Sequence, residues 1–202
     1  MYQWRALSRD ERAALLASRQ RRGAPWHGPP HWKQDGPARF HVNASCYEHA
    51  PIIGCTPARL DTFAGDLLRT CVEQHVQVFA WCLLPNHYHL LVETSDLRGL
   101  ARSLGQLHGR SSHAWNVADN SVGRKVFHRT ADRHIRSDGH FWATLNYIHH
   151  NPAHHGYVAN WSEWPWSSAG EYLHSVGREE ATRIWRSFPV YDTGKDWDEP
   201  GM

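Results

Sequence analysis

The chain has 202 residues, of which 41% are hydrophobic and 21% are charged, so we expect one globular domain with a buried core and terminal extensions. No stretch approaches the roughly 18–20 uncharged apolar residues of a membrane span, and the first 22 residues lack the apolar core of a secretory signal; we expect a cytoplasmic protein with no membrane partner. The net charge is only +2, yet residues 97–136 hold seven Arg and one Lys against two Asp, which indicates either a surface for a polyanion or a solvated basic face.

Apolar periodicity, turn residues and capping patterns predict alternating helices and strands over most of the chain. A capping box at Ser8 opens the first helix, and the tight Pro85-Asn86 turn joins two strands. Pro152 is expected to end the last core helix, because proline disfavours helical geometry in the residue before it. The expected elements in chain order are helix 8–22, a Pro- and Gly-rich linker 23–37, strand 39–47, helix 57–74, strands 76–84 and 87–94, helix 97–115, a short strand and return within 125–136, helix 139–151 and helix 168–176.

The order strand, helix, hairpin, helix, strand, helix is typical of an α+β fold with a ferredoxin-like antiparallel sheet and helices on one face. A doubly wound parallel sheet is the less favoured alternative, because the hairpin turn is too short for a crossover connection. We expect three regions: an N-terminal helix and linker over residues 1–37, a core domain over 38–158, and a Trp-rich acidic extension over 159–202 that packs on the core.

Two histidines lie two residues apart on the second strand of the expected hairpin. Strand periodicity places the side chains of His87 and His89 on one face, while Tyr88 points to the other. Two neighbouring imidazoles can share a divalent metal ion, although such a pair can also be polar residues on a solvent-facing sheet. The apolar strand that follows anchors the pair on core structure, and this context favours a metal site.

A tyrosine and an asparagine one turn apart on helix 139–151 can complete such a site. Tyr147 and Asn151 project from one helix face, and a Tyr hydroxyl can attack phosphorus when a metal ion polarises the phosphate. Mixed nitrogen and oxygen ligands with open positions suit Mg²⁺ or Mn²⁺ better than a closed structural zinc. His150 competes with Asn151 as the ligand, and Tyr147 can alternatively be a half-buried packing residue.

Basic residues are concentrated in and after helix 97–115, where we expect them to follow a phosphate backbone. Trp115, Phe127 and the Trp residues of segment 161–166 are candidates for stacking on unpaired bases, although Trp164 and Trp166 can equally fasten the extension to the core. The candidate DNA-contacting residues are Arg98, Arg102, Arg110, Arg124, Lys125, Arg129, Arg133 and Arg136.

A likeness to one protein family extends over residues 38–198. It is carried by three segments: WCLLPNHYHLLVET (81–94), NYIHHNPAHHGYV (146–158) and WPWSSAGEYL (164–173). Through them the chain resembles the REP-associated tyrosine transposases, single-tyrosine members of the HUH group, in which a histidine–hydrophobic–histidine motif lies on a sheet strand. The segment PAHHGYV departs from the pattern, because relatives more often have Val after the Pro and a basic residue before the Gly.

The resemblance implies an HUH nuclease core over residues 38–158 that recognises hairpins of repetitive extragenic palindromes (REP) and cuts and rejoins nearby single-stranded DNA. Tyr147 is then the catalytic nucleophile, which forms a 5′-phosphotyrosine and releases a 3′-hydroxyl. The protein would act as a monomer or homodimer, with the tyrosine helix serving its own histidine pair or that of a partner subunit. The alternatives are a non-catalytic hairpin-binding protein derived from such an enzyme and a zinc-dependent hydrolase, whose usual barrel needs about 250 residues.

Overall fold

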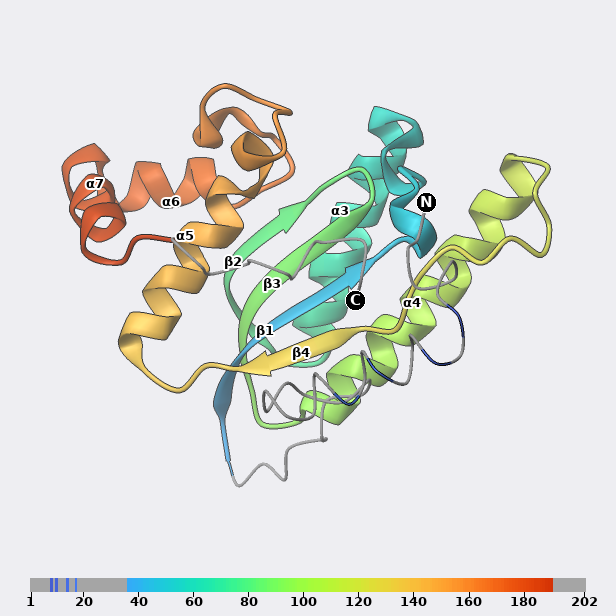
Figure 1. Cartoon of the computed structure of the whole chain (residues 1–202), viewed down its shortest axis with the longest axis horizontal. Helices are drawn as coiled ribbons and strands as arrows, with labels where there is room; N and C mark the ends of the chain where they lie inside the picture. The colour runs from blue at the N-terminus through green and yellow to red at the C-terminus, as the bar shows by residue number, and fades with distance from the viewer. Residues whose placement is uncertain (1–7, 9, 11–13, 15–16, 18–35, 191–202) are drawn as a thin grey trace.

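The computed structural model describes residues 36–190 and, before them, only residues 8, 10, 14 and 17 (Figure 1). The predicted helix 8–22, most of the linker 23–37 and the chain after residue 190 therefore lie largely outside the described residues. None of the helices described is long and apolar enough to cross a membrane. The elements in chain order are β1 (Ala38–Ser45), η1 (Tyr47–His49), η2 (Ile53–Cys55), α3 (Pro57–Glu73), β2 (Gln77–Leu83), β3 (His87–Thr94), α4 (Leu97–Ala118), β4 (Ala131–His134), α5 (Asp138–His154), η3 (Trp161–Glu163), α6 (Ala169–Val176) and α7 (Arg178–Ser187).

The strands form one antiparallel sheet in the order β2-β3-β1-β4. β3 lies between β1 and β2, and β1 lies between β3 and β4, so α3 and α4 each cross a neighbouring strand before the chain returns to the sheet. This is the split βαβ arrangement of ferredoxin-like folds, and the predicted α+β class is confirmed. A four-stranded sheet of this order is not the large barrel that the zinc-hydrolase alternative requires.

One face of the sheet packs against α3 and α4. The alternating apolar residues predicted for the first strand are all buried in this core: Phe40, Val42, Ala44 and Cys46. Each fully buried Leu, Val or Phe side chain contributes about 1.5–3 kcal/mol from its removal from water. The match between alternation and burial shows that the pattern identified the correct core face of β1.

Tyr88 anchors β3 on this core. Its side chain is fully buried, and its hydroxyl lies 3.1 Å from Nε2 of His108 on α4. Burial lowers the pKa of His108 to about 4, so the imidazole is neutral at pH 7 and its hydrogen bond to Tyr88 involves no charge. Because side chains alternate along a strand, fixing Tyr88 toward α4 turns His87 and His89 to the opposite face.

α5 covers that opposite face, so the expectation of helices on one face holds for α3 and α4 but not for α5. Phe141, Leu145 and Ile148 of α5 pack in one cluster with small side chains of β2, including Ala80 and Cys82. The apolar stripe of a helix predicts that it packs on something, but not which face of a sheet it covers. α5 therefore forms a second layer, directly above the two histidines.

α5 also runs through Pro152 to His154, and the prediction that it ends at residue 151 was wrong. A proline in the last turn removes only the one hydrogen bond that its missing N–H would have donated. The turn still closes, because His155 N donates to Asn151 O at 3.0 Å and Tyr157 N donates to Pro152 O at 2.9 Å. Asn151 consequently stays within regular helix, one turn after Tyr147.

The chain after α5 returns to the hairpin and then forms α6 and α7. Trp164 donates from Nε1 to the carbonyl oxygen of Leu83 at 2.8 Å, and Trp166 donates from Nε1 to the carboxylate of Asp61 at 2.8 Å. These contacts fasten the extension to β2 and α3. The predicted helix 168–176 matches α6, whereas α7 was not predicted, because the strongly charged segment REEATRIWRS buries only Ala181 and Ile184.

Candidate active site and DNA-contact surface

His87, His89, Tyr147 and Asn151 come together where β3 passes beneath α5. All four are buried, with exposed fractions of 3%, 0%, 6% and 0% in that order. The ring centroids of His87 and His89 are 4.9 Å apart, and the Tyr147 ring lies 5.3 Å from that of His89 at an angle of 73°. Asn151 Oδ1 lies 3.2 Å from His87 Nε2. The tyrosine helix thus contacts the histidine pair of its own chain.

The hairpin turn fixes the protonation of His87. Asn86 donates from Nδ2 to the carbonyl oxygen of His49 at 3.2 Å, which leaves its Oδ1 to accept from Nδ1–H of His87 at 2.7 Å. The turn itself is held because Gly54 N donates to Pro85 O at 2.9 Å, and any side chain at Gly54 would collide with Pro85. With its proton on Nδ1, His87 presents the lone pair of Nε2 to Asn151, as a metal ligand does.

A third histidine, which the sequence reasoning missed, supports the pair from β1. His41 is buried, and its Nε2 lies 3.0 Å from Nδ1 of His89. Its ring also lies edge-on to the Tyr147 ring, with the two ring centroids 6.1 Å apart. The signal was present in the strand pattern, because His41 alternates with Phe40 and Val42 and so must face away from their core. Only the pairing of β1 with β3 places it beside His89.

The two competing ligand candidates of α5 lie in different places. Asn151 faces His87, whereas the ring of His150 packs against Trp185 of α7 at 4.8 Å. His149 also points away from the histidine pair, and its Nε2 lies 2.9 Å from Ser168 Oγ. Burial lowers the pKa of His149 to about 3 and also lowers that of His150, so both rings are neutral at pH 7. Another histidine close to the pair is His155, whose ring lies 5.2 Å from His87.

The donor atoms fit a small divalent cation. The described residues contain no group of three His, Cys, Asp or Glu side chains suited to a metal ion, so the Asn151 amide oxygen is what extends the donor set beyond two imidazoles. Two ligands at right angles, each about 2.1 Å from Mg²⁺, lie about 3 Å apart. The separation between His87 Nε2 and Asn151 Oδ1 is 3.2 Å. This spacing would let His87 Nε2 and Asn151 Oδ1 hold one such cation together.

Comparison with known proteins gives one relative in sequence and one in structure. No protein-family model matches the chain. A curated protein of Haemophilus influenzae described as a REP-associated tyrosine transposase is 27% identical over 125 residues, which cover 54% of this chain and 68% of that protein.

The chain is thus similar in sequence to a REP-associated tyrosine transposase. A solved structure of such a transposase bound to a REP hairpin has the same fold, with a TM-score of 0.58 and 15% identity over 73% of this chain and 86% of that one. The resemblance inferred from the three sequence segments is confirmed.

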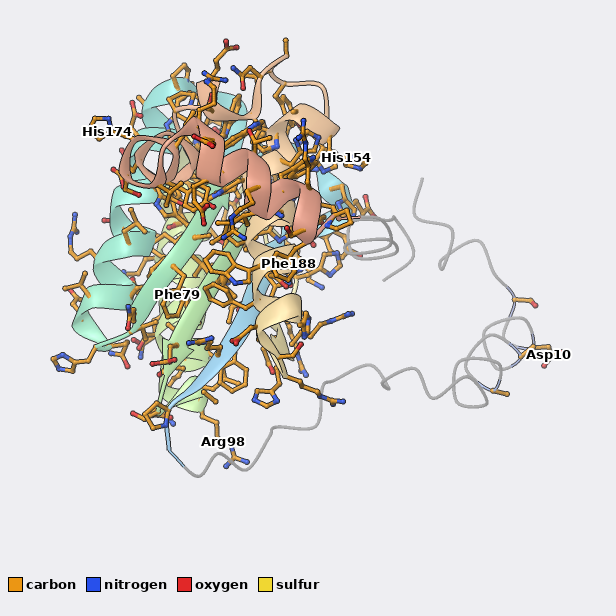
Figure 2. The ribbon with its side chains drawn as sticks, turned by 90° about the vertical axis from the view of Figure 1, so that its left-hand side faces the viewer. Asp10, Phe79, Arg98, His154, His174 and Phe188 are labelled. Atoms are coloured by element: carbon orange, nitrogen blue, oxygen red, sulfur yellow. The ribbon has the colours of Figure 1, made fainter. Side chains whose placement is uncertain are left out.

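Most of the candidate DNA-contacting side chains are exposed. An open groove of about 640 Å³ runs between α4 and segment 124–130, and Lys125 and Arg129 line it. Lys125 also lies over the ring of Tyr47, with Nζ 4.4 Å from the centroid. Arg98, at the start of α4, lies at the opposite end of the molecule from His154, at the end of α5 (Figure 2). The exposed members of the set are Arg98, Arg102, Arg110, Lys125, Arg129, Arg133 and Arg136.

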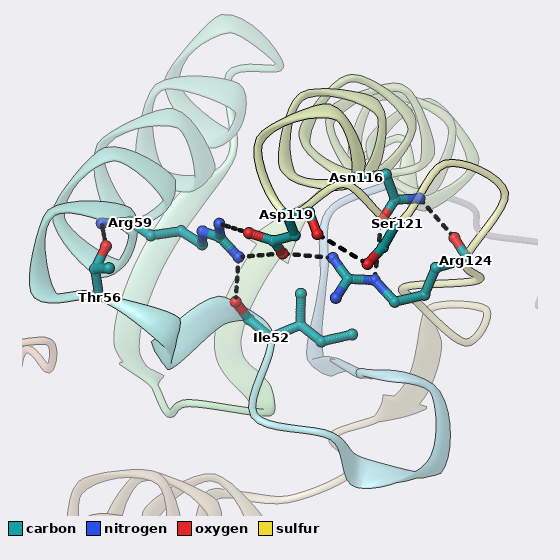
Figure 3. Close-up of polar contacts among 7 residues, drawn as sticks. All are labelled: Ile52, Thr56, Arg59, Asn116, Asp119, Ser121 and Arg124. Atoms are coloured by element: carbon teal, nitrogen blue, oxygen red, sulfur yellow. Dashed lines mark hydrogen bonds and ion pairs between the residues drawn. The ribbon is translucent and has the colours of Figure 1, made fainter.

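Arg124 differs from the rest of the set because it belongs to a structural network (Figure 3). Its guanidinium contacts Asp119 at 2.7 Å and donates from Nε to Asn116 Oδ1 at 2.9 Å. Asp119 also forms an ion pair with Arg59 of α3, with Oδ1 2.7 Å from Nη2. These two guanidinium groups, Arg59 foremost, hold the pKa of the Asp119 carboxyl far below its usual range. Arg124 also lines the groove, so it holds the loop after α4 in place while remaining part of this basic face.

The aromatic candidates for base stacking are corrected in part. Phe127 is 9% exposed and stacks on His108 at 4.1 Å, so it belongs to the core. Trp115 is half-buried and packs against Phe63 at 5.4 Å. Alternation could not reveal this, because segment 125–130 has no regular strand pattern and its burial depends on its approach to α4.

Proposed function

We propose that the protein is a metal-dependent endonuclease and strand transferase for single-stranded DNA that acts at REP-type hairpins through a phosphotyrosine on Tyr147. The observation that carries this proposal is the contact of Tyr147 with His89, one helical turn from the Asn151 amide that faces His87. Packing alone does not require a tyrosine there, because Leu145 and Ile148 already supply the apolar contacts of α5. The family relationship and the solved relative bound to a REP hairpin support the choice of DNA.

His87, His89 and Asn151 would hold Mg²⁺ or Mn²⁺, and the bound ion would polarise a phosphate oxygen of the DNA. The Tyr147 hydroxyl oxygen attacks phosphorus, so that the bond from Tyr147 to phosphorus forms as the bond from phosphorus to the 3′ oxygen breaks. The proton lost by Tyr147 is balanced by the proton that the departing 3′ oxygen gains. One phosphodiester replaces another, so the free energy changes little and the reverse step rejoins strands without ATP.

The basic groove and the candidate active site lie on opposite faces of the sheet but meet at the end of β1. His128 N, in the groove segment, donates to Ser45 O at 2.9 Å, and Ser45 pairs with His87. A DNA strand that follows Lys125 and Arg129 therefore reaches the histidine pair by passing around this end of the sheet. Phosphate contacts of this kind position DNA and do not read its sequence.

We further propose that residues 38–158 form the nuclease domain, with 1–37 and 159–202 as extensions, and that the protein acts on DNA in the cytoplasm. One chain carries every proposed participant in the chemical step, since Tyr147 contacts His89 and Asn151 contacts His87 of the same chain. This arrangement supports the proposal that a monomer carries out cleavage with its own tyrosine.

The test is formation of a covalent protein–DNA adduct. The full chain is incubated with a hairpin-bearing single-stranded oligonucleotide and Mn²⁺ and resolved on a denaturing gel. Wild type is expected to form the adduct, Tyr147→Phe to form none while still binding the DNA, and a chelator to abolish the adduct. Tyr157→Phe, which removes a hydroxyl from an exposed tyrosine, is the matched control and should react as wild type.

Equal adduct from Tyr147→Phe and wild type would show that the nucleophile is elsewhere. Hairpin binding that survives chelation, without any cleavage by wild type, would instead identify the non-catalytic hairpin-binding protein.

A further inference from the structure

A second cavity lies behind α5, among the elements that follow it. It has a volume of about 240 Å³, below the roughly 300–1,000 Å³ of ordinary ligand pockets, so it suits one small ring system. Figure 1 shows α5, α6 and α7 grouped at one side of the sheet, away from α4. The walls include His149 and His150 of α5, Trp161 of η3, Tyr172 of α6, and Arg178 and Trp185 of α7.

Three polar atoms of these walls are buried without a hydrogen-bond partner in the described part of the chain: Nδ1 of His149, Nδ1 of His150 and the hydroxyl of Tyr172. His149 is only 3% exposed. Buried polar groups normally have partners, and leaving one unpaired costs free energy. Three such atoms lie in the walls of one cavity.

The hydrogen bonds at Nε2 of His149 show whether its Nδ1 donates or accepts. Ser168 Oγ accepts from Trp81 N at 2.9 Å and donates to Trp81 O at 3.3 Å, so its proton is already used. His149 therefore donates from Nε2 to Ser168 Oγ at 2.9 Å, and its Nδ1 is an acceptor. The Tyr172 hydroxyl can donate. An acceptor and a donor thus lie in neighbouring rings of the cavity wall, where a small rotation of either side chain would turn them toward a ligand.

The remaining walls are flat and aromatic. The ring of His149 stacks on Trp161 with an interplanar angle of 12° and lies 4.9 Å from the ring of Tyr172. Trp185, with 36% of its surface exposed, covers the ring of His150. Arg178 adds a positive charge. Aromatic faces with a donor and an acceptor at the edge, beside a cation, fit a heterocyclic base that carries a phosphate.

We propose that this cavity binds one unpaired nucleobase of single-stranded DNA, with its backbone phosphate toward Arg178. The proposal rests on the proposed function for its choice of DNA. His150 and Tyr147 are three residues apart on α5, so the bound base would lie within one helical turn of the nucleophile. The site would hold a nucleotide close to the cleaved bond and so contribute to the choice of that bond.

The test compares two probes on the full chain in the presence of a chelator, so that no cleavage occurs. One probe is fluorescein-labelled dT10, and the other is a decamer of abasic nucleotides with the same phosphates. Wild type is expected to bind dT10 roughly tenfold more tightly than the abasic probe, because stacking requires a base. Trp185→Ala should weaken dT10 binding by roughly tenfold and Tyr172→Phe by roughly two- to tenfold, with little change for the abasic probe.

Matched controls are available in the same region. Arg178→Gln should weaken both probes, whereas Arg186→Gln, on the same helix but outside the cavity, and Tyr157→Phe should weaken neither. A dT10 probe carrying one 4-thiothymidine should crosslink to peptides within residues 161–185. Tyr172→Phe removes a single oxygen, so it remains informative if Trp185→Ala does not fold.

Unchanged dT10 affinity in both Tyr172→Phe and Trp185→Ala would overturn the proposal, as would crosslinks that map only outside the cavity or equal binding of the two probes by wild type. The covalent-adduct assay tests the catalytic role of Tyr147 independently of base binding. Loss of adduct formation with the preference for dT10 intact refutes only the catalytic proposal, and the reverse result refutes only the base pocket.

Discussion

At the scale of single residues, the candidate active site depends on how the histidine rings are oriented. His89 can ligate a metal ion through Nε2 only if its proton is on Nδ1, and Nδ1 lies 3.0 Å from His41 Nε2. His41 must then accept that proton's hydrogen bond. Such a partner fixes both the protonation and the rotation of a metal-binding imidazole. Under the proposed function, His41 would be a positioning residue that acts through His89.

Replacing His41 with Phe keeps a ring of similar size and removes the acceptor. We expect the Mn²⁺ concentration for half-maximal adduct formation to rise about 10- to 100-fold, with activity recovering at saturating Mn²⁺. A Mn²⁺ titration of the adduct assay measures this shift, and His41→Gln should restore part of it. His134→Phe, a strand histidine that packs against Phe40 at 5.4 Å, is the control. An unchanged Mn²⁺ dependence in His41→Phe would show that His89 does not need this partner.

At the scale of elements, one carboxylate ties α3 to the end of α4. Asp119 follows α4 directly and binds Arg59 of α3 at 2.7 Å and Arg124 of the next loop at 2.7 Å. Arg59 also donates to the carbonyl oxygen of Ile52 at 3.0 Å and lies over Trp115 at 5.3 Å. The guanidinium is thus held on several sides. The network holds the loop that follows α4, and so positions segment 124–130, which forms one wall of the basic groove.

Asp119→Asn should lower the urea midpoint of unfolding at neutral pH. The folded pKa of Asp119 is lowered, chiefly by Arg59, so its stabilising effect is complete above the ordinary Asp pKa of about 3.9 and is lost as the pH falls toward the folded value. The difference between wild type and variant should accordingly be constant from pH 5 to 7 and shrink below about pH 4. Urea unfolding followed by circular dichroism across this range provides the measurement.

Asp66→Asn is the comparison for Asp119→Asn, because Asp66 forms an exposed i,i+3 pair with Arg69 at 2.9 Å. Exposed pairs contribute about 0–1 kcal/mol, so little change is expected at any pH. A loss for Asp119→Asn no larger than for Asp66→Asn would mean that the network does not stabilise the fold.

At the scale of the whole molecule, the proposed function requires DNA to contact two faces of one thin sheet. The basic groove lies on the α4 side and the histidine pair lies under α5, and the two meet where His128 bonds to Ser45. Binding affinity should then come mostly from phosphates along α4 and segment 124–130, while the reacting phosphate enters a buried site. Removing one groove cation should weaken binding without changing the chemistry.

Arg129→Gln is expected to weaken binding of hairpin-bearing single-stranded DNA and to reduce the slope of log Kd against log salt by about 0.7–0.9, which corresponds to one phosphate contact. Fluorescence anisotropy between 50 and 300 mM NaCl measures the slope, and the adduct rate at saturating DNA should stay as in wild type. Arg69→Gln, an exposed arginine of α3 outside the groove, should leave the slope unchanged. A wild-type slope in Arg129→Gln would remove Arg129 from the phosphate path.

Much of the fold could be predicted because its signals are local. Alternation marked the buried face of β1 through Phe40 and Val42, and the Pro85-Asn86 turn marked the hairpin that carries the histidines. The errors occurred where burial depends on distant partners. Phe127 resembled a surface aromatic until the approach of its segment to α4 buried it on His108. The ion pair of Arg124 with Asp119 could likewise not be read from the sequence.

By itself, the sequence determined the α+β class, the common face of His87 and His89, and the i,i+4 spacing of Tyr147 and Asn151, since each follows from the periodicity of one element. Tertiary structure alone decided that α5 lies over β3 of the same chain, that Asn151 rather than His150 faces His87, and that His41 stands behind His89. It also decided that His149, His150 and Tyr172 share a cavity. The physical reason is that periodicity gives the direction of a side chain relative to its own element, whereas contacts depend on how separate elements pack.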